Sequence, residues 1–245
     1  MVFFIKYNKY KSSKNMAFDE ALMNFSIQTK SKAVLRLYGW ETPAVTIGRN
    51  QNTDDINIDY CLSNSIDITK RPTGGRALYH HDELTYCFIC PVDFLQNGTS
   101  VINSYKEISG ALIEGFKKLN IILEYPEYKK ISCKGGYCMS LSTGADLSYR
   151  GKKFIGSAQF RKNGYILQHG SIPFKIDFNK INKIFLEPAD FSKITTLHEI
   201  KPNIDINTVC ECLKAGFEEK FGVIIPFSQE DIASIICQSQ AQIYR

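Results

Sequence analysis

Residues 151–172 read GKKFIGSAQFRKNGYILQHGSI, a stretch with the length of one β-hairpin. Small residues at Gly156, Ser157 and Ala158 would let a ligand approach the backbone closely, and Lys153 would supply a cation beside that surface. These residue types favour a binding site. An exposed basic hairpin would have a similar composition, because solvated lysines in Gly-Lys-Lys turns are common. The stretch alone therefore leaves both interpretations open.

A second segment, residues 70–86 (KRPTGGRALYHHDELTY), favours the binding site. Its paired glycines, Gly74 and Gly75, lie between an extended run at 65–69 and an alternating run. Glycines there permit positive φ and expose backbone N–H groups. We expect these donors, with Arg71 alongside, to hold a carbonyl, carboxylate or phosphate group.

Together, RPTGG-x-A-x-x-H and GKK-x-x-GSAQ-x(9)-HGS resemble the lipoate-protein ligase and octanoyltransferase family. Members of that family attach octanoyl or lipoyl chains to lysines of carrier domains. The resemblance also covers MAFDEAL, LRLYGWETPAVTIGRNQN, ITTLHEI and GFEEKFG, and so spans nearly the whole chain. It implies an α+β fold with a largely antiparallel central sheet flanked by helices, similar to biotin-protein ligases and the catalytic core of class II tRNA synthetases.

Length and composition suggest one domain over residues 1–245, with a short helical segment at 205–245 packed on it. The chain has 245 residues, 44% of them hydrophobic, which is enough for a sizeable core. The net charge is +5 and the basic residues are scattered, which argues against nucleic acid and is compatible with an acidic protein partner. No apolar run is long enough for a membrane span, and we expect a cytoplasmic protein with reduced cysteines.

The pattern along the chain places helices at the start, near residue 110 and at the end, with strands between them. Asn15 can cap a helix from Met16, and Ser104 with Glu107 forms a capping-box pattern. The expected helices are therefore one from residue 16, one at 104–119, one ending at Phe221 before Gly222, and a short one at 228–235. The expected strands are 34–40, 44–48, 83–90, 121–125 and 223–225.

Two of these helices share the pattern Leu-x-x-Gly-Phe, at residues 112–116 and 213–217, each followed by an apolar stretch. Two copies at this distance do not make a repeat array. We interpret them as repeated helix–strand packing. Cys87 and Cys90 fall in a strand, where an odd separation points the two thiols to opposite faces and argues against chelation.

The resemblance gives Cys138 a catalytic role. In the octanoyltransferases that resemble this chain, the nucleophilic cysteine lies in a loop shortly before the lysine motif, where Cys138 stands. A thiolate attacks a thioester well, and a nearby ammonium raises the thiolate fraction. A spare loop thiol is the alternative. Cys133 is a weaker candidate, because it misses the family position.

Lys153 is the second catalytic candidate, for polarising the acyl carbonyl or contacting the oxygens of an acyl-adenylate. Strand alternation predicts that its neighbour Lys152 is exposed. Backbone N–H groups near Ser157 and Ala158 match the family's candidate oxyanion hole, and Asp146 is either a relic of a ligase motif or a partner of Lys153.

The remaining site candidates match family positions around the substrate. His80 matches a pocket histidine, while its neighbour His81 is expected at the surface. Arg71 and Thr73 match positions near the substrate headgroup, although a surface salt bridge is the alternative for Arg71. The full set of expected substrate-binding residues is Arg71, Thr73, Gly74, Gly75, His80, Gly156, Ser157, Ala158, His169 and Gly170. A structural histidine is nearly as good an interpretation for His169, and no metal site is expected.

The resemblance implies an octanoyltransferase that carries octanoyl from acyl carrier protein, through Cys138, to a lysine of a lipoyl-accepting protein. Such acceptors include the glycine cleavage H protein and the acyltransferase subunit of a 2-oxoacid dehydrogenase. No cofactor is then needed; ATP and magnesium enter only for a ligase. Arg76 replaces the third glycine that ligases commonly have, which favours the transferase. A lipoate ligase with a separate accessory subunit, an amidotransferase between lipoyl-accepting proteins, and a non-catalytic binder remain alternatives.

Overall fold

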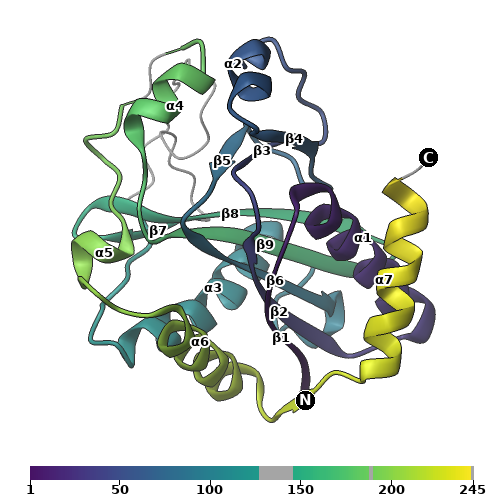
Figure 1. Cartoon of the computed structure of the whole chain (residues 1–245). Coiled ribbons are helices and arrows are strands. Elements are labelled where there is room, and N and C mark those ends of the chain that lie inside the picture. Colours follow the sequence, from purple (N-terminus) through teal and green to yellow (C-terminus); the bar gives the residue numbers. More distant parts are fainter. Residues whose placement is uncertain (127–145, 188–189, 244–245) are drawn as a thin grey trace.

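The computed structural model describes residues 1–126, 146–187 and 190–243 of the chain. In this part of the chain the strands form two sheets (Figure 1). The larger sheet has the strand order β10 (Ile224–Pro226), β1 (Val2–Tyr10), β2 (Ala33–Trp40), β6 (Glu83–Pro91), β9 (Tyr165–Pro173), β8 (Lys152–Lys162) and β7 (Leu147–Tyr149). The smaller has the order β4 (Asp67–Lys70), β3 (Ala44–Ile47) and β5 (Leu78–His80).

Helices cover both faces of the larger sheet. The described helices are α1 (Ser12–Thr29), α2 (Ile58–Ser63), η1 (Val92–Phe94), α3 (Val101–Lys117), α4 (Phe178–Ile184), α5 (Leu197–Ile200), α6 (Ile206–Phe221) and α7 (Gln229–Ile243). Strands β2, β6, β9, β8 and β7 pair antiparallel, whereas β1 pairs parallel with both β2 and β10. The α+β fold with a mostly antiparallel sheet is thus confirmed.

Alternation along β6 divides the core into two layers. Tyr86, Phe88 and Cys90 pack with α3 and α6, while Cys87 and Ile89 pack with α1 and α7 on the other face. Figure 1 shows these helix pairs on opposite sides of the sheet. The two cysteines therefore point to opposite faces, as the odd spacing predicts. A third cluster lies between the smaller sheet, α2 and α4.

The stretch at 151–172 forms the hairpin β8–β9, as expected. Its two-residue turn is Asn163-Gly164, with φ of 48° and 77°. Both values are positive, which matches the twist of a tight hairpin and explains the Asn-Gly pair. β9 also pairs with β6, so this hairpin lies inside the larger sheet.

Several local expectations are wrong. α1 begins at Ser12, and Asn15 lies buried inside it, donating from its amide to the carbonyls of Tyr10 and Gly39. α3 is capped by Ser100, whereas Ser104 lies within the helix. Residues 121–125 form no strand beyond a single bridge between Glu124 and Ser148. The last helix, α7, runs on to Ile243 because its apolar residues pack against α1.

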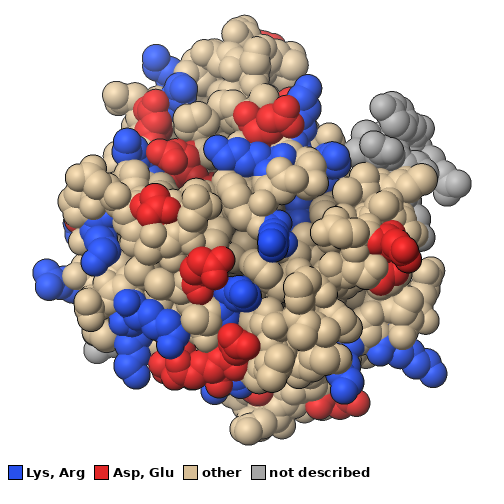
Figure 2. Space-filling view, turned by 60° about the horizontal axis from the view of Figure 1, so that its bottom comes forward, with Lys and Arg blue, Asp and Glu red and all other residues tan. Residues whose placement is uncertain are grey.

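Charge on the surface is mixed. Figure 2 shows one face of the molecule, on which Lys and Arg are interspersed with Asp and Glu. This agrees with the scattered basic residues of the sequence and gives no sign of a nucleic-acid footprint on that face. Among the described helices, none has both the length and the apolar character needed to cross a membrane.

The repeated Leu-x-x-Gly-Phe pattern marks the crossing of α3 and α6. A Cβ on Gly216 would lie 2.3 Å from the nitrogen of Gly115 and 2.4 Å from the carbonyl oxygen of Ala111. A Cβ on Gly115 would lie 2.9 Å from the backbone of α6 at Cys212 and Leu213. The two glycines thus let the helix backbones touch, and this explains the repeated pattern.

We expect Gly216→Ala to destabilise the protein by about 1–3 kcal/mol, since the methyl group overpacks a backbone contact. Gly110→Ala in α3 is the matched control, because its Cβ would come no closer than 3.6 Å to the end of the Lys220 side chain. The control should be neutral or about 0.5–1 kcal/mol more stable through helix propensity. Urea unfolding measures both. Equal midpoints for Gly216→Ala and the wild type would contradict this packing.

Candidate functional site

A narrow pocket lies between the larger sheet, the smaller sheet and the start of α1. It encloses about 450 Å³ of empty space, its open mouth included. The lining residues come from six strands and α1: Met16, Tyr38, Trp40, Thr46, Leu78, His80, Thr85, Gly156, Ser157, Ala158, His169, Gly170 and Ser171, together with Arg71 just after β4. Segments far apart in the sequence therefore share one cavity.

The hairpin supplies the pocket wall that has the smallest side chains. Gly170 pairs with Tyr86 on one side and with Ser157 on the other. A Cβ on Gly170 would lie 2.6 Å from the Tyr86 ring and 2.7 Å from the Ser157 hydroxyl. The Ser157 hydroxyl is itself 2.7 Å from the Tyr86 hydroxyl, which accepts from Gln168 at 2.9 Å. Glycine is thus required here, and the serine hydroxyl is held in place.

A β-bulge turns Lys153 toward the pocket side of the sheet. Leu147 pairs with Ile155 but Ser148 pairs with Lys153, so Phe154 is the extra residue. Phe154 and Ile155 both lie in the core against α3 and α6. Lys153 therefore faces the same side as Gly156, where it is 5% exposed and its Nζ lies 2.9 Å from the Asp146 carboxylate.

The Asp146 carboxylate is an ion-pair partner of Lys153 and is itself 2% exposed. Its part in catalysis stays a prediction. Lys152 is exposed, as predicted. Lys153 is not among the described residues that line the pocket itself; it lies beyond Gly156 along the same strand.

The guanidinium of Arg71 organises the glycine-containing loop at 71–76. Its Nη2 donates to the carbonyls of Gly74 and Arg76, both at 2.8 Å. Its Nη1 donates to the carbonyl of Thr46 at 3.0 Å and to the hydroxyl at 3.3 Å, and its Nε donates to the Thr73 hydroxyl at 3.1 Å. All five N–H donors of Arg71 thus have protein acceptors.

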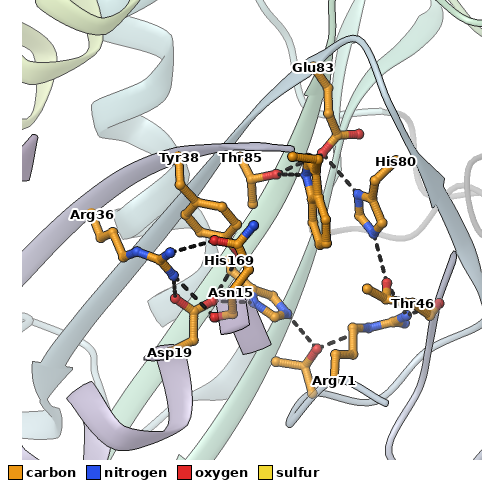
Figure 3. Close-up of polar contacts among 12 residues, drawn as sticks. Asn15, Asp19, Arg36, Tyr38, Thr46, Arg71, His80, Glu83, Thr85 and His169 are labelled. Atoms are coloured by element: carbon orange, nitrogen blue, oxygen red, sulfur yellow. Dashed lines mark hydrogen bonds and ion pairs between the residues drawn. The ribbon is translucent and has the colours of Figure 1, made fainter. Parts of the chain in front are cut away.

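From Arg71, one hydrogen-bond relay runs to α1 (Figure 3). The Thr73 hydroxyl lies 2.7 Å from Nε2 of His169, and Nδ1 of His169 lies 3.2 Å from the Asp19 carboxylate. Asp19 also accepts from the Tyr38 hydroxyl at 2.9 Å and forms a buried ion pair with Arg36. Residues that are 150 positions apart in the chain thus meet in one line.

A second relay runs from Arg71 to β6. The Thr46 hydroxyl lies 2.8 Å from Nε2 of His80, and Nδ1 of His80 lies 2.9 Å from Glu83. Glu83 also accepts from Thr85 and Ser171, at 2.7 and 2.6 Å, and from the indole of Trp40 at 3.0 Å. The Trp40 ring stacks on His80 with centroids 3.9 Å apart.

The ends of both relays fix the direction of the outer hydrogen bonds. Arginine only donates, and an ionised carboxylate only accepts. Each threonine hydroxyl therefore accepts from Arg71, and each histidine donates from Nδ1 to its carboxylate. Because the ring of His169 is neutral at pH 7, its Nε2 is an acceptor that faces the Thr73 hydroxyl.

Burial and neighbouring charges shift the pKa values of three relay groups. Burial alone would raise the pKa of Asp19, but the Arg36 guanidinium and the hydrogen bond from His169 hold it below its usual value. Burial likewise opposes ionisation of Glu83, whose pKa is held low by His80 and by the hydroxyls of Ser171 and Thr85. Burial lowers the pKa of His169, so this ring is neutral at pH 7.

The structure brings most of the expected substrate-binding residues together. Seven line the pocket: Arg71, His80, Gly156, Ser157, Ala158, His169 and Gly170. Thr73 is buried and bonds to His169, whereas Gly74 and Gly75 are exposed in the loop and His81 is at the surface, as expected. Cys138 and Cys133 lie outside the described residues. Contact with substrate, and the expected absence of a metal, stay predictions.

Sequence reasoning missed the acids of the relays. Asp19 stands in MAFDEAL, and Trp40 and Thr46 stand in the run beginning LRLYGWETP, so the signal was present in stretches already singled out. Glu83 carried no such signal beyond its place two residues after a pair of histidines. The sequence does not show that these residues form hydrogen bonds with one another across the fold.

Comparison with known proteins identifies a matching family and relatives of this chain. The sequence model described as "Lipoyl protein ligase A/B catalytic domain" matches residues 11–218. Octanoyltransferase LipM of Carboxydothermus hydrogenoformans is 32% identical over 94% of this chain and 80% of its own length. Octanoyltransferase LipM of Clostridioides difficile is 32% identical over 96% of this chain and 92% of its own length.

Solved structures share the fold. A lipoate-protein ligase A bound with ATP superposes with a TM-score of 0.80 at 19% identity, covering 100% of this chain and 94% of that one. A bi-partite lipoate protein ligase from Thermoplasma acidophilum, whose structure was studied with its E2 lipoyl domain, gives a TM-score of 0.75 at 17% identity, covering 99% and 91%.

The depressed pKa of His169 predicts acid sensitivity. The unfolded chain takes up the histidine proton near pH 6.5 and the folded protein only at lower pH, so stability falls as the pH falls below about 6.5, by up to about 1.4 kcal/mol per pH unit. His169→Gln should lower stability at pH 7.5 by about 1–3 kcal/mol, because buried partners lose their contacts. It should also lose less stability between pH 6.5 and 5.0.

Urea unfolding at both pH values measures this effect, with the exposed His81→Gln as the matched control. The control should follow the wild type. If His169→Gln and the wild type lose the same stability over this pH range, His169 is not the group responsible.

Proposed function

The chain belongs to the lipoyl protein ligase A/B catalytic-domain family, and from this membership we propose that it is an octanoyltransferase acting in protein lipoylation. The observation that carries the proposal is the similarity, at 31–32% identity over about nine-tenths of the chain, to relatives named octanoyltransferase. The pocket supports the proposal, because its shape and its lining suit a slender acyl chain.

The walls of the pocket combine apolar surface with polar groups that are already satisfied. Met16, Leu78 and the Trp40 ring supply apolar contacts, and small residues on β8 leave room along the backbone. Thr46 and His80 have partners within the relay, so a methylene chain beside them leaves no hydrogen bond unmade. An acyl group can therefore enter without a desolvation penalty from unpaired polar groups.

The proposed reaction has two acyl transfers. The Cys138 thiolate attacks the carbonyl of an octanoyl thioester on acyl carrier protein; a new C–S bond forms, and the carrier thiolate leaves. The ε-amine of a lysine on a lipoyl-accepting protein then attacks the octanoyl-cysteine. An amide forms, the cysteine leaves as a thiolate, and the amine loses a proton. The thioester supplies the free energy for both steps, so no nucleotide or other cofactor is required.

Lys153 is proposed to stabilise the oxyanion that develops in each transfer. It lies on the pocket side of β8 because of the bulge at Phe154, three residues before Gly156. Asp146 fixes the position of its ammonium group through the 2.9 Å ion pair. A preorganised donor of this kind acts at no reorganisation cost when charge develops.

Two alternatives differ in the donor. An ATP-dependent lipoate ligase would activate a free acid, and an amidotransferase would take octanoyl from a lipoyl-accepting protein. Arg76 in place of a third loop glycine supports the transferase, since the loop is less free to wrap a nucleotide. The proposed acceptor is the glycine cleavage H protein or an acyltransferase subunit of a 2-oxoacid dehydrogenase, and the proposed compartment is the cytoplasm.

We expect octanoyl-acyl carrier protein, without ATP, to add one octanoyl group to Cys138. Intact-protein and peptide mass spectrometry measure the adduct, and Cys138→Ser should abolish transfer to the acceptor. Cys133→Ser is the matched control and should retain transfer. Octanoyl mapped to Cys133, or pyrophosphate released from ATP and free octanoate, would overturn the transferase proposal.

Lys153→Ala should slow formation of the octanoyl-enzyme by on the order of a hundredfold, the usual effect of losing one transition-state donor. The adjacent, exposed Lys152→Ala should change the rate by less than about twofold. Quenched-flow sampling followed by mass spectrometry gives both rates. Similar rates for the two variants would remove the role proposed for Lys153.

A further inference from the structure

The motif ITTLHEI, residues 194–200, has no part in the roles described so far. It contains Ile194, Thr195 and Thr196, each at most 5% exposed, and then the short helix α5. Figure 1 shows α5 at the end of the larger sheet that carries β7, and Lys153 stands at the same end of β8. The motif is therefore close to a candidate catalytic residue.

Segment 193–195 takes the place of β9 beside Lys153. The pairing of β8 with β9 ends at Gly156. Beyond that point the backbone nitrogen of Lys153 donates to the carbonyl of Lys193 at 2.7 Å, and the Lys153 carbonyl accepts from the nitrogen of Thr195 at 2.9 Å. These two bonds form a parallel β-bridge. Both backbone polar groups of Lys153 are thus held by one segment.

The strand on the other edge of β8 does not compete for these groups. Ser148 lies opposite Lys153 in β7, but its own nitrogen and carbonyl are bonded to Glu124, at 2.8 and 2.9 Å. The bulge at Phe154 disrupts the ladder at this point. Segment 193–195 pairs the polar groups of Lys153, and so stabilises the bulged backbone that turns the lysine to the pocket side.

Side chains of the same motif fix this segment. The Thr195 hydroxyl donates to the Glu199 carboxylate at 2.8 Å. That carboxylate also accepts from the backbone nitrogen of Thr196 at 3.3 Å, and the Thr196 hydroxyl accepts from the nitrogen of Glu199 at 3.4 Å, which completes the capping box of α5. Ile194 packs in the third cluster, and Leu197 packs in the core with α3 and α6. The segment is thus anchored on both sides of Thr195.

We propose that Thr195 and Glu199 are positioning residues for Lys153. The proposal rests on the proposed function, in which the Lys153 ammonium stabilises the oxyanion. A lysine carries its ammonium on a flexible four-carbon stem. The ion pair with Asp146 holds the far end of that stem, and the bonds to segment 193–195 hold the near end.

The hydroxyl of Thr195 joins the backbone clamp on Lys153 to the capping box of α5. Loss of this hydroxyl therefore lets the backbone of Lys153 shift, and the ammonium shifts with it. A misplacement of about 1 Å is enough to slow a reaction about a hundredfold. The expected effect is on the chemical step, because the residues that line the pocket are unchanged.

The test uses the full chain with octanoyl-acyl carrier protein, and quenched flow with mass spectrometry gives the rate of octanoyl-enzyme formation. Thr195→Val removes the hydroxyl but keeps the shape and the backbone nitrogen. It should lower the maximal rate about ten- to a hundredfold and leave the donor concentration at half-maximal rate within about twofold of the wild type. Thr195→Ser keeps the hydroxyl and should restore the rate to within about threefold of the wild type.

Thr42→Val is the matched control, because it removes a bond of the same kind, from a threonine hydroxyl to the Asp67 carboxylate at 3.2 Å, in the turn between β2 and β3. Its rate should match the wild type. Glu199→Ala, at an exposed position, is a second variant with the same expected loss as Thr195→Val, and it serves if the latter does not fold.

A double variant distinguishes positioning from general structural support. If Thr195 acts through Lys153, Lys153→Ala/Thr195→Val should react at the rate of Lys153→Ala alone, within about twofold. A further loss in the double variant, by the factor that Thr195→Val causes in the wild type, would contradict the inference.

The outcomes separate this inference from the function on which it rests. If the wild type forms no octanoyl-enzyme, or if Lys153→Ala reacts at the wild-type rate, the proposed function or its use of Lys153 fails. If Lys153→Ala is slow but Thr195→Val and Glu199→Ala react at the wild-type rate, the positioning role fails alone.

Discussion

The hydrogen bonds donated by the Arg71 guanidinium are the interactions on which the pocket depends. Its five donors hold the loop at 71–76, one end of β3 and the two threonines that begin the relays. Because a guanidinium cannot accept a hydrogen bond, both threonine hydroxyls accept from it. The smaller sheet, the larger sheet and α1 are thereby tied together around a cavity whose polar groups are already paired.

The structure gives Arg71 a different role from the two that the sequence suggested. Sequence reasoning placed Arg71 beside the substrate headgroup or in a surface salt bridge. The structure shows it 6% exposed, with protein acceptors for every donor. A second buried cation, Lys153, is turned to the pocket side by a bulge in β8 and is held there by Asp146.

Buried charge is tolerated here because it is compensated. Asp19 and Glu83 each collect several donors, and their pKa values are lowered despite complete burial. Such networks hold a single geometry firmly, since breaking any member leaves a buried group unpaired. The hydrogen bonds of these groups therefore fix the geometry of the pocket wall.

Local sequence determined the features that need only neighbouring residues. The Asn163-Gly164 turn specified the β8–β9 hairpin, alternation separated Cys87 from Cys90, and the motifs around Gly74 and Gly156 indicated a binding site and its family. Only tertiary structure decided which acids meet which histidines and that two glycines form one helix crossing. The physical reason is the distance along the chain over which each kind of interaction acts. Turn and pleat preferences act over a few residues, whereas a hydrogen bond between Asp19 and His169 exists only after packing has brought them together.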